Sequence, residues 1–332
     1  MKILVVGGAG YIGSHMVKML LEQGHAVKTF DNLSSGFQDA VLGGDFIRGD
    51  LADQAKLDEV FDAHQPDAVM DFASHIRVDE SVKHPDKYYF NNVSNTLNLL
   101  NAMVRHEVEY FIFSSSAAIF GEPEYVPIDQ AHPKNPLNPY GRSKWMIEQI
   151  LEDYERAYGL KSTCLRYFNA AGADPSGLLS ERHEPETHLI PLALQAISGK
   201  RGGICVYGRD YDTPDGTCIR DYIHVVDLCA AHGMALGRLM ATGLSRRYNL
   251  GNGQGYSVQE VIDAAKRVTG YKMKVIDGPR RPGDPARLVA DPTPAREELG
   301  WVPAYPDLET IILHAWESLG VRLLSERKRR VA

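Results

Sequence analysis

Tyr140 and Lys144 lie four positions apart in the stretch PYGRSK, where a helix is expected to begin. Residues at this spacing share one face of a helix, so an ordinary surface pair is one interpretation. The other is a device for moving protons, because a nearby cation favours the phenolate and lowers the tyrosine's reference pKa of about 10. This second interpretation requires the rest of the chain to supply a reaction for the tyrosine to assist.

A glycine-rich turn near the N-terminus bears on that choice. The stretch VVGGAGYIGSH places Gly7, Gly10 and Gly13 directly after an apolar strand and at the start of a helix, and Gly8 gives an overlapping G-x-G-x-x-G pattern. Glycine permits a tight turn and close backbone approach, and the free N–H groups of a helix N-terminus bind pyrophosphate. Because strand, turn and helix occur in this order, the stretch predicts a dinucleotide site.

Acidic residues close the next two predicted strands. Asp31 follows the turn by about 20 residues, where an acid accepts hydrogen bonds from the adenosine ribose. The adjoining NLSSG contains no Arg or Lys for a 2′-phosphate, which favours NAD over NADP. Asp50 ends the third strand and could reach the adenine. Each acid alone is equally well explained as a loop cap, but together they favour a NAD site.

A nicotinamide would give Tyr140 its reaction. Removing a hydride from an alcohol carbon requires the hydroxyl proton to leave as well, so a base must contact the oxygen. Ser116 ends the strand that contains FSSS and could hydrogen-bond the same oxygen, with Ser114 and Ser115 as alternatives. Beside this serine and the glycine turn, we interpret Tyr140 and Lys144 as catalytic rather than as a surface pair.

The elements that must position these residues alternate along the chain. Strands are expected at KILVVGG, AVKTFD, DFIRGD, DAVMDFA, YFIFSSS and KSTCLRYF, with long helices over residues 85–106 and 139–158. Such alternation predicts right-handed βαβ units and a sheet covered on both faces. The expected fold class is α/β: a doubly wound, mostly parallel Rossmann sheet with a smaller mixed α/β C-terminal substrate lobe.

The pattern changes after Phe168. The segment NAAGADPSGLLSERHEPETH is rich in Gly, Pro and charge, so we expect a long functional connection. Short strands and helices follow, and one helix opens at SVQE with Ser257 and Glu260 as a capping box. We therefore divide the chain into a NAD-binding Rossmann domain (1–168) and a region (169–332) that is mainly substrate lobe, with some segments returning to the Rossmann sheet.

Charge and composition limit the possible partners. The chain has 332 residues and a formal net charge of −7, which argues against nucleic-acid binding, and the basic run at 327–330 is interpreted as a solvated tail. No apolar run reaches the roughly 18 residues that cross a bilayer, and we recognise no signal peptide.

Cysteine usage favours a reducing compartment. Cys164, Cys205, Cys218 and Cys229 show no C-x-x-C spacing and no paired His ligands at metal spacing. We therefore expect reduced thiols, no metal site and a cytoplasmic location.

Nine stretches carry a resemblance over nearly the whole chain: GGAGYIGSH, DNLSSG, GDL, YYFNNVSNTLNLL, FSSSAAIFG, NPYGRSK, LRYFNAAGADPSG, DGTCIRDYIHVVDL and RRPGDPARLVAD. On these, the sequence resembles the extended short-chain dehydrogenase/reductase superfamily and, within it, the UDP-glucose (UDP-galactose) 4-epimerases. The glycine turn and the Tyr-x-x-x-Lys pair are typical of the superfamily. RYFNAAGADPSG and DGTCIRDYIHVVDL are much more diagnostic of the epimerase branch.

The resemblance implies a role for each matched residue. Tyr140 would be the base, Lys144 would lower its pKa and bond the nicotinamide ribose, and Ser116 would order the sugar hydroxyl. The implied NAD site comprises Gly7, Gly10, Tyr11, Ile12, Gly13, Asp31, Asn32, Asp50, Leu51, Phe72, Ala73, Asn91, Ser114, Tyr140, Lys144 and Tyr167. The implied substrate site comprises Ser116, Tyr140, Asn169, His188, Leu189, Tyr207, Arg220, Tyr222, Arg281, Asp284 and Leu288.

The implied activity interconverts UDP-galactose and UDP-glucose. C4 is oxidised with NAD, the 4-keto sugar rotates, and re-reduction occurs on its other face, so NAD is retained as a prosthetic group. Leu288 falls at the wall beside the sugar 2-position, and its small size predicts some activity on UDP-GlcNAc and UDP-GalNAc, although simple packing is the alternative. The helices at 88–106 and 139–158 resemble those that pair in the family's dimers, so a homodimer is implied.

Two alternatives have sequence tests. A nucleotide-sugar 4,6-dehydratase typically needs an Asp-Glu pair beside the serine, whereas Ala117 and Ala118 stand there. A non-catalytic NAD-binding regulator should lack the tyrosine, the lysine or the serine, and this chain keeps Tyr140, Lys144 and Ser116.

Overall fold

The computed structural model describes residues 1–281 and 283–331, and the side chains up to residue 320, so the basic run at 327–330 lies outside the described side chains. Its centre is a seven-stranded sheet. In spatial order the strands are β10 (Arg246–Leu250), β6 (Lys161–Tyr167), β5 (Tyr110–Ser116), β4 (Ala68–Asp71), β1 (Lys2–Val6), β2 (Ala26–Asp31) and β3 (Asp45–Arg48). Every adjacent pair is parallel. The expected doubly wound α/β fold is confirmed.

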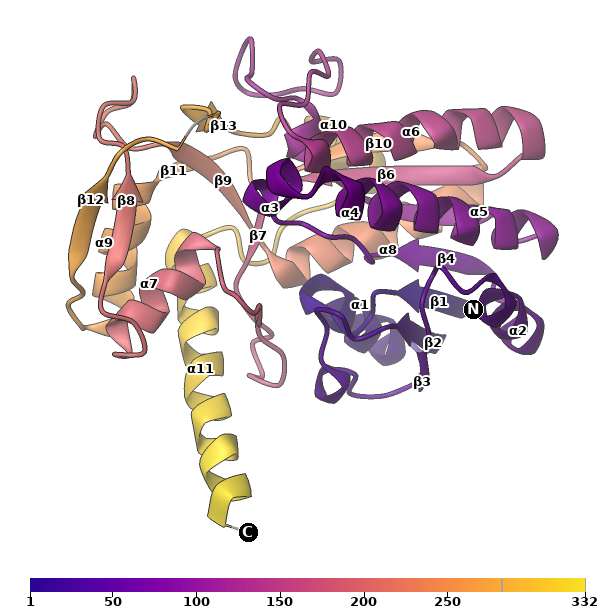
Figure 1. Cartoon of the computed structure of the whole chain (residues 1–332), viewed down its shortest axis with the longest axis horizontal. Helices are drawn as coiled ribbons and strands as arrows, with labels where there is room; N and C mark the ends of the chain where they lie inside the picture. Colours follow the sequence, from indigo (N-terminus) through magenta and orange to yellow (C-terminus); the bar gives the residue numbers. More distant parts are fainter. Residues whose placement is uncertain (282, 332) are drawn as a thin grey trace.

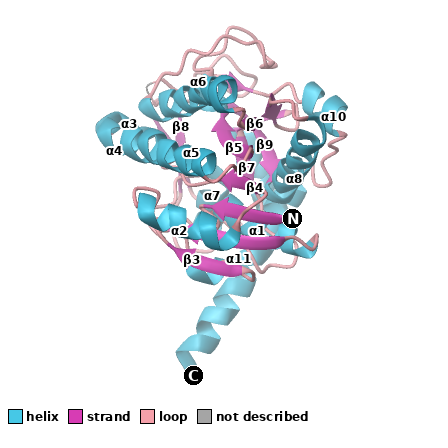
Figure 2. Cartoon of the chain, turned by 90° about the vertical axis from the view of Figure 1, so that its right-hand side faces the viewer, coloured by secondary structure: helices cyan, strands magenta, loops and turns pink. Residues whose placement is uncertain are grey.

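Helices cover both faces of this sheet, as Figures 1 and 2 show. One face packs against α1 (Tyr11–Glu22), α8 (Val225–Thr242) and α10 (Thr293–Leu299). The other packs against α2 (Gln54–His64), α5 (Asn95–Arg105) and α6 (Pro139–Tyr158). Strands buried on both faces must be apolar throughout, which explains their continuous runs of Val, Ile, Leu and Phe.

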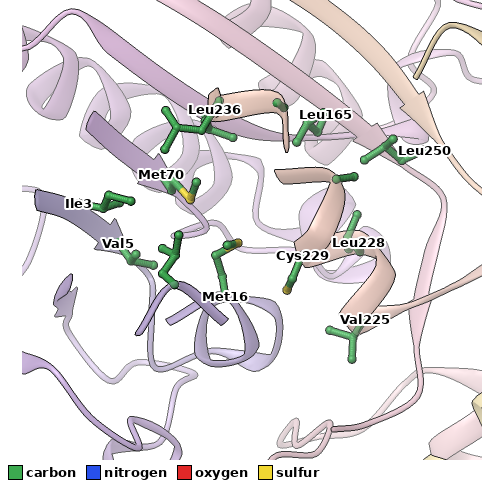
Figure 3. Close-up of a cluster of buried hydrophobic side chains, with 14 of the residues drawn as sticks. Ile3, Val5, Met16, Met70, Leu165, Val225, Leu228, Cys229, Leu236 and Leu250 are labelled. Atoms are coloured by element: carbon green, nitrogen blue, oxygen red, sulfur yellow. The ribbon is translucent and has the colours of Figure 1, made fainter. Parts of the chain in front are cut away.

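Segments far apart in the sequence share the core on the α1 face. Figure 3 shows Val5 of β1 and Met16 of α1 beside Leu228 and Leu236 of α8, and all four side chains are buried. Burying one such side chain contributes about 1.5–3 kcal/mol. Together with β10, helix α8 therefore joins the second half of the chain to the Rossmann sheet.

The helix expected over residues 85–106 is interrupted. It consists of α4 (Pro85–Tyr89), a π-helical turn η2 (Phe90–Ser94) and α5, and it is preceded by α3 (Val78–Lys83). Asn92 lies in the π turn, where its side chain accepts from the N–H of His75 (2.8 Å) and donates to the His75 carbonyl (3.0 Å). The wider turn places this amide against the loop after β4, and π turns are frequent at functional sites.

Helix α6 matches its expected range. The side chain of Asn138 caps its first turn by accepting from the Gly141 N–H (2.9 Å), and Pro139 occupies the first turn, which needs no N–H. Gly159, with φ of +78°, ends the helix in a left-handed conformation. Because the helix begins at Pro139, Tyr140 is its second residue.

The second lobe is small and mixed, as expected, and lies to one side of the sheet in Figure 1. A four-stranded sheet contains β7 (Asn169–Ala171), β9 (Ile219–His224), β11 (Gly255–Ser257) and β13 (Arg287–Leu288), while β8 (Ile204–Tyr207) pairs with β12 (Val275–Gly278). Its helices are α7 (Leu189–Ile197), α9 (Val258–Thr269) and α11 (Leu308–Val331), which share one apolar core. The predicted capping box of Ser257 and Glu260 is confirmed at α9.

Two short 3₁₀ helices complete the described elements. They are η1 (Gln38–Ala40) after β2 and η3 (Ala117–Ile119) directly after β5. Among the described helices, none is both long and apolar enough to cross a membrane.

Candidate active site

The glycine turn between β1 and α1 is tight and faces the loop after β4. Gly7 has φ of +73°, and a Cβ there would lie 2.6 Å from the Ala73 nitrogen. A Cβ on Gly13 would lie 2.2 Å from the Gly7 carbonyl oxygen. Gly10 is the N-cap of α1, with no side-chain cap and no acid in the first turn. The uncapped helix N-terminus therefore fits the pyrophosphate of a dinucleotide.

The acids predicted for the adenosine half meet at the ends of β2 and β3. Asp31 accepts from the backbone N–H of Ala9 (2.9 Å) and of Leu33 (2.7 Å). Burial raises the pKa of Asp31, and these two backbone hydrogen bonds oppose the rise. The Asn32 amide donates to the Asp50 carboxylate (2.8 Å). Asp31 thus also braces the glycine turn, a role that the sequence interpretation did not include.

Other residues predicted for the cofactor have varied surroundings. Phe72 and Tyr167 both contact the ring of His232, with centroids 5.1 and 5.9 Å away. The Tyr11 hydroxyl donates to the Gly172 carbonyl (2.8 Å) and ties α1 to the second lobe. Asn91 donates to the Asn92 side chain (3.0 Å), whereas Leu51 and Ile12 pack in or against the apolar cores.

Tyr140 and Ser116 come together from two neighbouring elements. Ser116 is the last residue of β5 and Tyr140 lies in the first turn of α6, and their exposures are 8% and 9%. Burial raises the pKa of Tyr140, and hydrogen bonding with the Ser116 side chain opposes the rise. The Ser116 hydroxyl also accepts from the Ala118 N–H (3.1 Å), which orients its oxygen.

Lys144 is buried one helical turn beyond Tyr140, with 3% exposure. Its ammonium donates to the Ser74 hydroxyl and to the Ser114 carbonyl, each at 2.6 Å, and lies 4.7 Å from the centre of the Phe113 ring. Burial lowers the pKa of Lys144 to about 8, and the charge of Asp71 opposes the fall. None of these contacts is with Tyr140, so the effect of Lys144 on the phenol stays a prediction.

Two buried residues near this group were missed by sequence reasoning. Asp71 ends β4, where burial raises its pKa to about 6 and the charge of Lys144 opposes the rise. Asn92 donates to the Ser143 hydroxyl (3.1 Å), and so links the β4 loop to α6. An acid inside the apolar stretch DAVMDFA was a signal for Asp71, since buried carboxylates need a partner. No comparable signal marked Asn92.

The residues predicted for the UDP group form a more open cluster in the second lobe. Arg220 of β9 makes an ion pair with Asp284 and donates to the Ile219 carbonyl (2.7 Å). The guanidinium of Arg281 lies 4.1 Å from the centre of the Tyr207 ring. Guanidinium groups suit pyrophosphate oxygens because they donate in pairs.

Leu288 lies beside this cluster, since it pairs with Arg220 across β13 and β9. It also packs, half-buried, against the apolar cluster of Ala117 and Ile119 that follows Ser116. The position thus lies between the cluster of Arg220 and the residues that follow β5.

The remaining predicted substrate residues lie at the edge of this lobe. Asn169 and Tyr222 are partners across β7 and β9, and the Asn169 amide donates to the Asp221 carbonyl (3.1 Å). Leu189 begins α7 and packs against the core of the lobe. His188 precedes it, and its Nδ1 lies 2.8 Å from the carboxylate of Glu181. The structure therefore does not bring its Nδ1 to Arg220 and Asp284.

Known proteins share this arrangement over the full length. Residues 3–251 match the model of the NAD dependent epimerase/dehydratase family. A UDP-glucose 4-epimerase from Halalkalibacterium halodurans is 51% identical over 316 residues, covering 95% of this chain and 95% of that protein.

Solved structures of 4-epimerases are also similar to this chain. The crystal structure of a UDP-glucose 4-epimerase from Brucella ovis in complex with NAD has a TM-score of 0.94 and 50% identity, covering 96% of this chain and 98% of that one. The UDP-Glc/GlcNAc 4-epimerase from Campylobacter jejuni has a TM-score of 0.84 and 42% identity, covering 96% and 99%. The resemblance inferred from the sequence motifs is confirmed, and the chain belongs to the NAD dependent epimerase/dehydratase family.

Proposed function

We propose that this protein interconverts UDP-galactose and UDP-glucose, with NAD held as a retained prosthetic group. The observation that carries the proposal is the meeting of Tyr140 with Ser116 at the end of β5, with buried Lys144 one helical turn away. The names of the H. halodurans and B. ovis relatives, and the NAD bound to the latter, support it.

The proposed cycle uses the chain's own residues to hold and move one proton. A bound nicotinamide cofactor would supply the hydride chemistry at C4 of the sugar, in both directions. Tyr140 takes the 4-hydroxyl proton during oxidation and gives it back during reduction, as general base and then general acid. Ser116 holds the same oxygen, and burial of both side chains excludes water from the keto sugar.

The cofactor would be held by the glycine turn with Asp31 and by Lys144 at the end of β5. Gly7, Gly10 and Gly13 would leave room for the pyrophosphate, and Asp31 at the end of β2 would accept from the adenosine ribose. Lys144 is within reach of the Ser114 carbonyl at the β5 end, where the nicotinamide ribose would lie. The other proposed contacts are Tyr11, Ile12, Asn32, Asp50, Leu51, Phe72, Ala73, Asn91 and Tyr167.

Turning the keto sugar over requires firm contacts to UDP and few to the hexose. Arg220 and Arg281 would bind the pyrophosphate, and Tyr207 would lie beside them. The other proposed substrate contacts are Asn169, His188, Leu189, Tyr222 and Asp284. A site with its charges concentrated in the second lobe leaves the sugar free to rotate about its bonds to the pyrophosphate.

Two other functions are less well supported. A 4,6-dehydratase requires an acid and a base beside the serine, and η3 places Ala117 and Ala118 there instead. A regulator that had lost catalysis would not need to keep Tyr140, Lys144 and Ser116 buried in one group. Neither alternative is favoured by the names of the relatives.

The test is a reaction without added cofactor. Purified protein is incubated with UDP-galactose alone, and the anomeric signals of the sugar are followed by NMR. The expected result is UDP-glucose, which requires both 4-epimerisation and retained NAD. If no signal changes even after NAD is added, the proposal is wrong, and a 4-keto-6-deoxy product would establish the dehydratase instead.

We also propose that the enzyme acts on UDP-GlcNAc and UDP-GalNAc. Leu288 at the wall beside the sugar leaves more room for an N-acetyl group than a tyrosine would. The name of the C. jejuni relative, a UDP-Glc/GlcNAc 4-epimerase, supports this breadth.

We further propose a cytoplasmic homodimer in which residues 1–168 bind mainly NAD and residues 169–332 bind mainly the UDP-sugar. Four free cysteines support a reducing compartment.

Val82 of α3, Phe90 of η2 and Met146 of α6 expose apolar side chains on neighbouring helices, which supports pairing through this face. Light scattering coupled to size-exclusion chromatography tests the dimer, and a monomer mass would contradict it.

A further inference from the structure

Two histidines and two glutamates form a compact group in the connection between β7 and α7. Glu181, His183, Glu186 and His188 come from the single stretch ERHEPETH. One ligand atom from each residue can be chosen so that all four lie within 4.8 Å of one another. Glu181, His183 and Glu186 have no part in the proposed reaction, and His188 is proposed only as a substrate contact, so the grouping of the four needs its own explanation.

The distances within the group are those of a coordination sphere. His188 Nδ1 lies 2.8 Å from a Glu181 oxygen and 3.0 Å from a Glu186 oxygen. His183 Nδ1 lies 3.3 and 3.5 Å from the same two carboxylates. A tetrahedral Zn²⁺ with bonds of about 2.0–2.1 Å holds its ligand atoms about 3.3–3.4 Å apart. The four nitrogen–oxygen distances therefore bracket the edges of such a tetrahedron.

The carboxylates of the group are buried, and in the part of the chain that the structure describes only the group's own two histidines lie close enough to balance them. The side chains of Glu181 and Glu186 are 6% and 5% exposed. Among the described residues, the only cationic groups within ion-pair distance of these carboxylates are His183 and His188. Arg182 lies between them in the sequence, but pairs with Asp39 instead.

One atom of the group lacks any hydrogen-bond partner. His183 Nδ1 is buried and makes no hydrogen bond, although it faces both carboxylates. Buried polar atoms are usually satisfied, and an unpaired imidazole nitrogen beside two buried carboxylates is what a divalent cation would satisfy. The missing hydrogen bond of this nitrogen points to the same ligand as the distances do.

We propose that Glu181, His183, Glu186 and His188 bind one divalent transition-metal ion, of which Zn²⁺ is the best fit. Two imidazoles and two carboxylates suit this class of ion, and four protein ligands make a closed, structural site. The His183 ring contacts the ring of Tyr11 edge-on, with centroids 6.2 Å apart, and His188 directly precedes α7. The ion would therefore fasten the connection between the start of the cofactor helix and the substrate-side helix.

The test reads metal content directly and uses the full-length protein without a histidine tag. The protein is stripped with EDTA, given Zn²⁺, dialysed and analysed by inductively coupled plasma mass spectrometry. Wild type should retain about one Zn²⁺ per chain, and His183→Ala and Glu181→Gln should retain only background amounts. Glu184→Gln is the matched control, because Glu184 is an exposed acid in the same stretch and lies outside the group.

Cobalt substitution adds a spectroscopic readout. Co²⁺ in a tetrahedral site of nitrogen and oxygen ligands absorbs visible light strongly, so the wild type should gain bands that both ligand variants lack. Glu181→Gln keeps the size of the side chain, and circular dichroism checks that each variant is folded. These measurements do not depend on turnover, so failure of the epimerase assignment would leave them unchanged.

Two outcomes would overturn the proposal. One is a wild type that retains no Zn²⁺ or Co²⁺, which would leave the group as an ion-pair cluster of histidines and glutamates. The other is equal Zn²⁺ retention by the wild type and both folded ligand variants, which would place the metal elsewhere on the chain.

Discussion

The catalytic group and the UDP cluster differ in how completely the fold prepares them. Tyr140 and Ser116 are almost fully buried, and Lys144 already donates to Ser74 and to a main-chain carbonyl. In the UDP cluster, Arg220 and Asp284 retain 11% and 26% exposure and pair with each other. Under the proposed function, the first region is already arranged for its reaction, whereas the second holds charges that the ligand would take over.

The difference follows from the elements that carry the two groups. The catalytic side chains project from the end of a central strand and from a capped helix, both held by the cores on either side of the sheet. The UDP cluster combines short strands with the segment from Arg281 to Leu288. Rigid donors suit a transition state, because reorganisation is costly during the reaction. A binding cluster can exchange an internal ion pair for the pyrophosphate without that cost.

Removing the proton carrier should cause the largest loss. Tyr140→Phe keeps the packed ring and deletes the hydroxyl, so kcat for UDP-galactose should fall by about 100- to 10,000-fold. The bound NAD, read from its absorbance after denaturation, should remain. A kcat close to the wild-type value would show that the group at the end of β5 is not the proton carrier.

Breaking the UDP cluster should weaken binding more than chemistry. Arg220→Ala removes a charge-assisted contact of about 1.5–3 kcal/mol, so KM for UDP-galactose should rise by about 10- to 100-fold with little change in kcat. Arg280→Ala is the control, because Arg280 directly precedes Arg281 but pairs with Asp210 and stacks on Tyr211. A similar rise in KM for both variants would mean that the effect is general charge loss.

Enlarging the wall between the two regions should change specificity. Leu288→Tyr should crowd an N-acetyl group, so the ratio of kcat/KM for UDP-GalNAc to that for UDP-galactose should fall by about 10-fold. Leu288→Met, which nearly conserves volume, should leave the ratio unchanged. If wild type does not act on UDP-GalNAc under conditions where UDP-galactose turns over, the prediction is wrong.

The parts predicted from the sequence are those encoded by local spacing. The strand–turn–helix at Gly7, the bounds of α6 and the capping box at Ser257 each depend on residues close together in the chain. Hydrophobic periodicity likewise predicted the parallel sheet and its coverage.

The parts that were missed depend on contacts across the fold. The charges of Asp71 and Lys144 influence each other only in the folded chain, since 73 positions separate the two residues in the sequence, and Asn92 in the π turn bonds to His75. His188 was predicted as a substrate contact, and the sequence reasoning did not include the contacts of its Nδ1 with Glu181 and Glu186. The grouping of Glu181, His183, Glu186 and His188 was not expected either, because only the cysteines and paired His spacings were considered, and the pattern E-x-H-x-x-E-x-H was not.

The smallest expected effect concerns the charge of Lys144. Burial lowers its pKa from 10.5 to about 8, so the cation near the phenol is lost as the pH rises through about 8, and kcat/KM for UDP-galactose should fall there. The lowered pKa of Lys144 also makes its contribution to folding stability depend on pH. Between about pH 8 and 10.5 the unfolded chain binds more protons than the folded one, so the contribution of Lys144 to folding stability should rise with pH through that window.

A substitution at Asp71 should change the pH at which kcat/KM falls without altering Tyr140. Its charge raises the pKa of Lys144, so Asp71→Asn should shift the fall in kcat/KM to lower pH, while the amide oxygen can still accept from the Ala73 N–H. Asp86→Asn is the control, because Asp86 is an exposed acid on α4, and it should leave the pH of this fall unchanged. If kcat/KM of Asp71→Asn falls at the same pH as in the wild type, the fall is caused by another group. The buried ammonium of Lys144 would then act through hydrogen bonding rather than through its titration.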